Sequence, residues 1–237
     1  MTTYQNLPVA TVFRDADSVR RGPLPAEVSM EPVVSGASFA REDVLLAEAG
    51  GFFAVWACDA GIYPRVKDKR GSFMYLLEGA GTIVDDDGTT HELTADSVLI
   101  LPFGWSGHWN ITQTIRKVYV HTTPVPPFRK GTQPATFVSA PDLARGDQVI
   151  FDGPDGRCAA ATIATGVQDQ VSHDRARFTY VLAGEASVAD AHGRTLELTA
   201  GCAIGFPDGW SGTWSVRTPL RTFDVFSTPV RKGATHE

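Results

Sequence analysis

The chain has 237 residues, enough for one large domain or for two domains of about 100–120 residues, and it can bury a core without disulfide bridges. Its 21 Lys and Arg against 27 Asp and Glu give a formal charge of −6, which disfavours a protein that binds nucleic acid or an anionic membrane surface. The 23 glycines and 15 prolines indicate many turns, so we expect an all-β protein.

The first half of the chain contains short runs that are rich in β-branched and aromatic residues and separated by turn residues, a pattern typical of strands. A short helix is expected over residues 40–49. In chain order, strands are predicted at residues 52–56, 73–77, 81–84, 97–101 and 116–122. Residues 85–88 (DDDG) predict a hairpin turn, because their glycine can take a positive φ.

The same pattern returns in the second half of the chain at a constant offset of 105 residues. Residues 102–109 (PFGWSGHW) return as residues 207–214 (PDGWSGTW), and the turn at 85–88 returns at 190–193. A repeat of this length predicts two homologous domains. We place the N-terminal domain at residues 1–125, and the linker with the C-terminal domain at residues 126–237.

The cysteines Cys58, Cys158 and Cys202 are widely spaced and odd in number, which argues against a disulfide framework and against a Cys-rich zinc site. The first residues lack the pattern of a signal peptide, and no apolar run reaches the ~20 residues that span a bilayer. We therefore expect a cytoplasmic protein that contacts neither membrane nor nucleic acid.

The segments YLLEG (75–79), the acidic turn ending in glycine and PFGWSGHW (102–109) together resemble the cupin superfamily. The most similar branch includes ureidoglycine aminohydrolase and the ethanolamine-utilisation-like cupins. Because both copies carry the pattern, the resemblance implies a bicupin with two tandem jelly-roll (RmlC-like) barrels. Cupin barrels host isomerases, dioxygenases, decarboxylases, hydrolases and storage proteins, so the fold alone does not name a function.

The resemblance also implies where a cupin metal site would lie, with two His, a Glu and a third His as ligands. The corresponding positions hold Arg65, Lys67, Ser72 and Gly107 in the first copy, and Gln170, Ser172, Arg177 and Gly212 in the second. None of these is one of those ligand types, and cations repel a divalent metal, so we expect no metal and no other cofactor.

Alternation along a strand places Tyr63, Arg65 and Lys67 on one face, where Ser72 and Met74 join them across a hairpin. Two buried cations need a counter-charge, so one interpretation is a pocket for a carboxylate or phosphate. Arg65 would offer a fork of hydrogen bonds and Lys67 a point charge. The alternative is an edge strand on which both side chains are solvated.

On the last strand of the first copy, either Lys117, Tyr119 and His121 or the opposite set of side chains faces inward; the sequence leaves both open. A His beside a Tyr can transfer protons without a metal, because imidazole titrates near neutral pH. Candidate catalytic residues are therefore Tyr63, His108, Tyr119 and His121. Candidate substrate-binding residues are Arg65, Lys67, Ser72, Trp105, Gln170 and Arg177.

In the second copy, Asp224 and Phe226 replace Tyr119 and His121, so we expect one working barrel and one structural barrel, with the first favoured. The leading hypothesis is an enzyme that acts on a small anionic organic molecule by acid–base chemistry, as an isomerase, cyclase, lyase or hydrolase. The second is a non-catalytic binding or accessory protein. The third is a metal-dependent hydrolase similar to ureidoglycine aminohydrolase, with an unusual ligand set around His108 or His173. A homodimer is an expectation carried by the resemblance.

Overall fold

Residues 12–48, 51–124, 133–172, 175–191 and 193–228 are described by a computed structural model. They form two antiparallel β-barrels in tandem, as the repeat predicts, so the protein is all-β. No helix in these ranges is both long and apolar enough to cross a membrane.

The N-terminal barrel is a nine-stranded sheet, in which the strands follow the order β10-β8-β6-β9-β4-β3-β2, with β5 on β9 and β7 on β6. Its strands are β2 (Ala26–Ser29), β3 (Phe39–Glu48), β4 (Gly51–Cys58), β5 (Gly61–Val66), β6 (Gly71–Asp85), β7 (Thr90–Leu93), β8 (Val98–Leu101), β9 (Ser106–Thr122) and β10 (Thr136–Val138).

The C-terminal barrel is an eight-stranded sheet, in which the strands follow the order β1-β16-β14-β17-β12-β11, with β13 on β17 and β15 on β14. Its strands are β1 (Val12–Arg14), β11 (Gln148–Gly153), β12 (Gly156–Ile163), β13 (Gly166–Ser172), β14 (Arg177–Asp190), β15 (Thr195–Thr199), β16 (Ala203–Phe206) and β17 (Ser211–Phe226). The hairpin turns are confirmed, since Gly88 and Gly193 have φ of 87° and 78°.

The prediction of a short helix over residues 40–49 is wrong. This segment is β3, which pairs with β2 on one side and with β4 on the other. Ala, Leu and Glu prefer a helix only weakly, and two neighbouring strands satisfy the backbone N–H and C=O groups of β3 equally well. The short helices of the described chain are α1 (Ala16–Arg21) and α2 (Ala140–Leu143).

The long strands of both barrels are buried on two faces, and this fixes which side chains point inward. Val118 and Val120 of β9 lie in a core shared by the two barrels, in which the rings of Phe53 and Phe178 are 5.4 Å apart. Because neighbouring side chains on a strand alternate, Lys117, Tyr119 and His121 face the interior of their own barrel.

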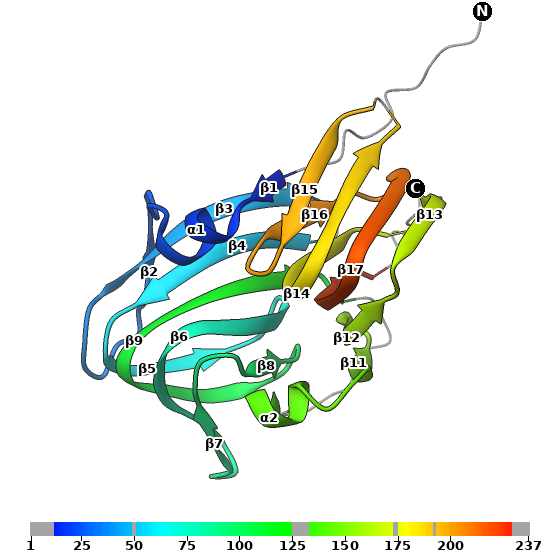
Figure 1. Ribbon diagram of the computed structural model, residues 1–237. Coiled ribbons are helices and arrows are strands. Elements are labelled where there is room, and N and C mark those ends of the chain that lie inside the picture. The colour runs from blue at the N-terminus through cyan, green and yellow to red at the C-terminus, as the bar shows by residue number, and fades with distance from the viewer. Residues whose placement is uncertain (1–11, 49–50, 125–132, 173–174, 192, 229–237) are drawn as a thin grey trace, which may run out of the picture.

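Each barrel includes one strand that lies, in the sequence, just before the other barrel. β1, near the N-terminus, pairs with β16, and Figure 1 shows it in dark blue beside the orange strands of the C-terminal sheet. β10, which follows the first barrel, pairs with β8 of the N-terminal sheet. The sheets therefore cut across a simple division of the chain at residue 125.

A short helix follows each exchanged strand, and one arginine holds the end of each helix. Arg116 donates to the carbonyl oxygens of Val19 (2.8 Å) and Gly22 (2.8 Å) at the end of α1. Its counterpart in the repeat, Arg221, donates to the carbonyl oxygens of Leu143 and, at 2.8 Å, Gly146 at the end of α2. Cationic donors at the C-terminus of a helix satisfy carbonyls that lack an intrahelical partner.

Candidate functional site

A cavity of about 140 Å³ lies inside the N-terminal barrel, between β2, β4, β9 and the end of β5. Its wall combines basic, aromatic and sulfur-containing side chains. It is lined by Val28, Ser29, Met30, Trp56, Arg65, Lys67, Trp109, Lys117, Tyr119 and His121. The cavity thus brings together four of the predicted catalytic and substrate-binding residues: Arg65, Lys67, Tyr119 and His121.

Lys117 lies at the centre of this cavity wall. Its ammonium group is 4.1 Å from the centre of the Trp56 ring and 4.3 Å from that of Trp109, and 3.1 Å from the Met74 sulfur. The side chain is 7% exposed, and burial together with the charge of Lys67 holds its pKa well below the usual range. The described residues provide it with aromatic faces and a thioether rather than a carboxylate.

Lys67 is the second ammonium group of the cavity, and its backbone is held on both sides. Its N–H donates to the carbonyl oxygen of Trp105 at 2.8 Å, and its carbonyl accepts the N–H of Gly104 at 2.7 Å. Burial, followed by the charge of Arg65, lowers the pKa of Lys67 to about 8. In the described part of the chain its Nζ has no hydrogen bond or ion pair.

A carboxylate that sequence reasoning missed, Glu42, contacts Tyr119 of the cavity wall. It is 8% exposed, and its Oε2 accepts the hydroxyl hydrogen of Tyr119. Burial and this bond raise the pKa of Tyr119, so the phenol stays protonated. The segment of Glu42 was predicted as a helix; the alternation of β3 against β4, which pairs Glu42 with Trp56, is the signal that would have placed it inward.

His121 is the remaining titratable group of the cavity. Its ring lies edge-on to Tyr119 at 4.8 Å and near Phe52 at 5.6 Å. Burial and the nearby charges of Lys67 and Lys117 hold its pKa well below the usual value. The imidazole is therefore neutral near pH 7 and can accept a proton.

The guanidinium of Arg65 is already engaged by the backbone. It donates to the carbonyl oxygens of Pro64 (2.5 Å), Pro32 (3.2 Å) and Met30 (2.7 Å). These bonds fasten the end of β2 to β5 and use most of the donors of the fork. The positively charged groups of the cavity that are not bonded to backbone carbonyls of the described residues are consequently Lys67 and Lys117.

Several predicted site residues lie outside this cavity. Tyr63 is fully buried, and its hydroxyl donates to the carbonyl oxygen of Asp59 at 3.1 Å; burial raises its pKa to about 12. Trp105 donates its indole N–H to Asp85 at 2.8 Å. Ser72 is buried beside His121 in the β6–β9 pairing, and its hydroxyl has no partner among the described residues. His108 lies on the opposite face of β9 from its neighbour Trp109.

The interior of the C-terminal barrel has its charge compensated from within. Arg177 forms two hydrogen bonds to the carboxylate of Asp224, at 2.9 and 3.0 Å, and its guanidinium lies 5.1 Å from the Trp214 ring centre. Asp224 also accepts from the hydroxyls of Thr179 and Thr222 at 2.6 and 2.7 Å. The side chain of Gln170 and residue His173 lie outside the described part of the structure.

The positions of the cupin metal ligands do not fit a divalent metal. A side chain at Gly107 would begin 2.2 Å from the carbonyl oxygen of Val84, and one at Gly212 would begin 2.2 Å from that of Ala189. Neither position can therefore hold a histidine without moving backbone. The two strand positions of the first barrel carry Arg65 and Lys67, whose charge opposes a cation. Within the described ranges, no three His, Cys, Asp or Glu side chains gather in one place.

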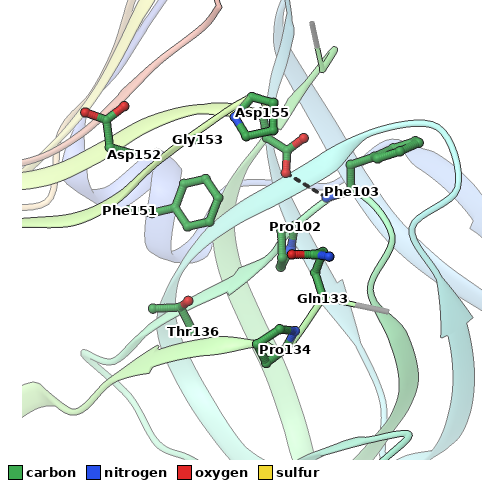
Figure 2. A pocket seen from close by; sticks show the side chains of 10 residues that line it. Pro102, Phe103, Gln133, Pro134, Thr136, Phe151, Asp152, Gly153 and Asp155 are labelled. Carbon is green, nitrogen blue, oxygen red and sulfur yellow. Dashed lines mark hydrogen bonds between the residues drawn. The ribbon is translucent and has the colours of Figure 1, made fainter. Parts of the chain in front are cut away.

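A second cavity, of about 200 Å³, lies at the seam between the barrels (Figure 2). Phe151, Pro102 and Pro134 form much of its wall, and among the described residues no basic side chain lines it. The carboxylate of Asp155 accepts the N–H of Phe103 at 2.7 Å, which ties the two barrels together. This cavity holds none of the predicted site residues, and the charged side chains of its described lining, Asp152 and Asp155, do not suit an anion.

Comparison with known proteins agrees with the two-barrel architecture. The family model described as "EutQ-like cupin domain" matches residues 47–119 and again residues 155–222. None of the curated protein sequences matches the chain.

Solved structures resemble the chain over nearly its whole length. A protein of unknown function from Pseudomonas syringae pv. tomato is 10% identical, with a TM-score of 0.71, over 93% of this chain and 100% of the other. The protein Ylba from E. coli is 13% identical, with a TM-score of 0.64, over 93% and 95%. A Cupin 2 conserved barrel domain protein from Leptotrichia buccalis is 8% identical, with a TM-score of 0.61, over 89% and 100%. At these identities the likeness concerns the fold.

Proposed function

The chain belongs to the EutQ-like cupin family and carries two copies of its domain, and from this premise we propose that the N-terminal barrel binds a small organic anion and transfers protons on it. The C-terminal barrel is then a structural partner. The reaction belongs to the isomerase, cyclase, lyase or hydrolase type, and the chain's own acid–base groups carry it.

One observation carries the proposal: two lysines line a single cavity, and neither ammonium group forms an ion pair with a carboxylate of the described residues. A buried charge without compensation is costly, and two such charges of the same sign are costlier. Glu42, the carboxylate of the cavity, is bonded to Tyr119. A bound anion supplies the missing negative charge.

The size of the cavity limits the ligand. At about 140 Å³ it is close to the apolar cavities of about 150 Å³ that hold benzene, so it accepts a molecule of about six non-hydrogen atoms. Trp56 and Trp109 give the cavity apolar wall against which a short carbon chain can pack, and the ammonium groups of Lys67 and Lys117 suit its carboxylate. A short-chain carboxylic acid matches these features better than a sugar or a nucleotide.

Three side chains supply the acid–base chemistry. His121 is neutral and can act as the general base. Tyr119 donates its hydroxyl hydrogen to Glu42, and we assign to this pair the acid that gives a proton to the ligand and recovers it. A base and an acid on one cavity wall are what proton abstraction followed by reprotonation requires.

Calorimetry tests the binding half of the proposal with acetate, lactate, succinate and inorganic phosphate as probes. We expect a small carboxylate to bind, and its affinity to fall by about tenfold or more in Lys117→Met, since one charge-assisted contact is lost. The matched control is Lys69→Met, which removes an exposed lysine near the same strand. If none of these carboxylates binds, or if both variants bind alike, the anion site is wrong.

Hydrogen exchange tests the catalytic half. The bound acid is incubated in D₂O, and NMR follows deuterium incorporation at the carbon beside its carboxylate or carbonyl group. Exchange that is lost in both His121→Phe and Tyr119→Phe supports acid–base catalysis. Binding without exchange would favour the second candidate, a non-catalytic binding protein.

A cytoplasmic location fits this proposal, because Cys58, Cys158 and Cys202 are all unpaired thiols in buried positions. The homodimer expected from the resemblance, and the lack of nucleic-acid and membrane partners, stay predictions for sizing and binding experiments.

A further inference from the structure

We propose that Lys67 is a nucleophile that forms an imine with the carbonyl carbon of a small oxo acid whose carboxylate is held by Lys117. The inference rests on the proposed function, because it uses the same cavity. It adds a substrate class, the short-chain 2-oxo acids, and a covalent step.

The geometry separates the roles of the two lysines. The ammonium group of Lys117 lies over two indole faces, at 4.1 and 4.3 Å, and beside the Met74 sulfur at 3.1 Å. Burial lowers the pKa of Lys117, but aromatic faces stabilise a cation, so Lys117 is the lysine whose charged form has contacts to support it when an anion enters. The amine of Lys67 has no such contact and no hydrogen bond within the described chain, which leaves its lone pair available.

The backbone of Lys67 is fixed, so the amine reaches the cavity from a defined point. Its N–H and C=O both bond to the turn at Gly104 and Trp105. The hydrogen bond from the Trp105 indole to Asp85 fixes this turn. A nucleophile on a rigid support meets its target with little loss of conformational freedom.

The charged surroundings favour the neutral amine. Lys67 faces Arg65 from β5, Lys117 and His121 from β9, and the cavity that Glu42 borders from β3. Burial and the charge of Arg65 lower its pKa to about 8, so a useful fraction is unprotonated near neutral pH. Desolvation and a neighbouring cation are the two usual means of activating a lysine for imine formation.

The step balances without an oxidant or reductant. The Nζ lone pair forms a bond to the carbonyl carbon, the carbonyl π bond breaks, and oxygen takes up a proton while nitrogen loses one, which gives a neutral carbinolamine. The C–O bond then breaks as that oxygen leaves as water with a second proton, and nitrogen forms the C=N bond and loses its second proton. The Tyr119–Glu42 pair can give and recover these protons.

Borohydride trapping tests the inference on the full chain. Pyruvate, of about six non-hydrogen atoms, is the probe, and lactate is the matched control that has a hydroxyl in place of the carbonyl. Borohydride reduces an imine to a stable amine, which mass spectrometry of the intact chain and of its peptides locates. We expect a pyruvate adduct on Lys67, no lactate adduct, and faster trapping as the pH rises through about 8.

Lys67→Arg keeps the positive charge but cannot form the imine, so we expect about tenfold less adduct, or none. Lys69→Arg, the exposed control, should trap as the unchanged chain does. Pyruvate that binds no better than lactate and leaves no adduct on Lys67 would overturn this inference while the anion site stands. An adduct on Lys117 would also overturn it. If neither acid binds, the proposed function fails as well.

Discussion

The two barrels of this protein share a backbone plan and differ in how they treat charge inside it. In the N-terminal barrel the inward face of β9 carries Lys117, Tyr119 and His121. In the C-terminal barrel the same positions of β17 are Thr222, Asp224 and Phe226, and Asp224 neutralises Arg177. In the first interior, Lys67 and Lys117 form no ion pair with the described residues, whereas the second interior pairs its arginine internally.

This contrast teaches that a few substitutions can change how a duplicated barrel balances its internal charge. Arg177 stands where the first copy has the small Ser72, so its side chain enters the interior that the first barrel keeps open. Ala161 stands where the first copy has Trp56, which removes one aromatic wall. A buried, bidentate ion pair holds a barrel in a single arrangement and leaves no charge for a ligand.

The largest effect should come from breaking that pair. Asp224→Ala leaves Arg177 buried without a partner, and we expect the free energy of unfolding to fall by about 3–5 kcal/mol, as measured by urea denaturation. The control is Asp147→Ala, which breaks the exposed pair with Arg221 and should leave stability nearly unchanged. Equal effects of the two variants would refute the view that the second barrel depends on its internal charge balance.

The mirror change in the first barrel should act in the opposite direction. Lys117→Met removes a buried cation that has no carboxylate partner and replaces it with an apolar chain of similar length. We expect the ligand-free protein to gain about 1–3 kcal/mol in urea denaturation, less whatever the indole contacts contribute. A clear loss of stability would indicate that the ammonium group is already compensated, and that the barrels do not differ as described.

Two tryptophans sharpen the comparison through their hydrogen bonds. Trp105→Phe leaves Asp85 without the indole donor, whereas Trp214→Phe loses an indole N–H that has no partner among the described residues. Both side chains are buried, so the cost of the smaller ring is similar. We expect Trp105→Phe to be the more destabilising by about 1–2 kcal/mol in thermal or urea unfolding. The reverse order would remove the structural role assigned to Trp105.

The smallest predicted effect is on the loss of folding stability at low pH. The folded chain keeps His121 neutral while the unfolded chain binds a proton near the ordinary pKa, so stability falls as the pH drops below about 6.5. His121→Phe copies the residue of the second barrel and should remove up to about 1 kcal/mol per pH unit of this loss. Urea denaturation at about pH 5.5 and about pH 7.5 measures it. Parallel pH profiles for the two proteins would contradict a neutral His121.

The repeat made the tandem barrels predictable, because its two copies carry the same turns at the same spacing. The inward face of β9 was not predictable locally, since Lys117, Tyr119 and His121 alternate with valines that are as suitable for an interior. Only the packing of the second barrel against Val118 and Val120 decides between the two faces. Pairing with its two neighbouring strands, β2 and β4, decided β3, and with it the place of Glu42.

The lining of the cavity was predictable in part for the same reason. The cluster of cations was visible in the sequence, and Lys67, Tyr119 and His121 do meet in one cavity. The direction of Arg65 was not visible, because its partners are backbone carbonyls at residues 30 and 32, more than thirty positions away. Side-chain types indicate chemistry, whereas the choice between a ligand and a backbone partner belongs to the tertiary structure.

The exchange of β1 and β10 has a consequence for how the chain is made. β1 leaves the ribosome first, yet its partner β16 is among the last strands to be synthesised. β10 closes the first sheet only after the chain has turned toward the second. Neither barrel can be completed by its own contiguous stretch of polypeptide, so a nick at residues 125–132 would yield two fragments that each lack an edge strand and hold one belonging to the other. Such fragments should recombine as complementary halves, because each carries the edge strand that the other barrel lacks.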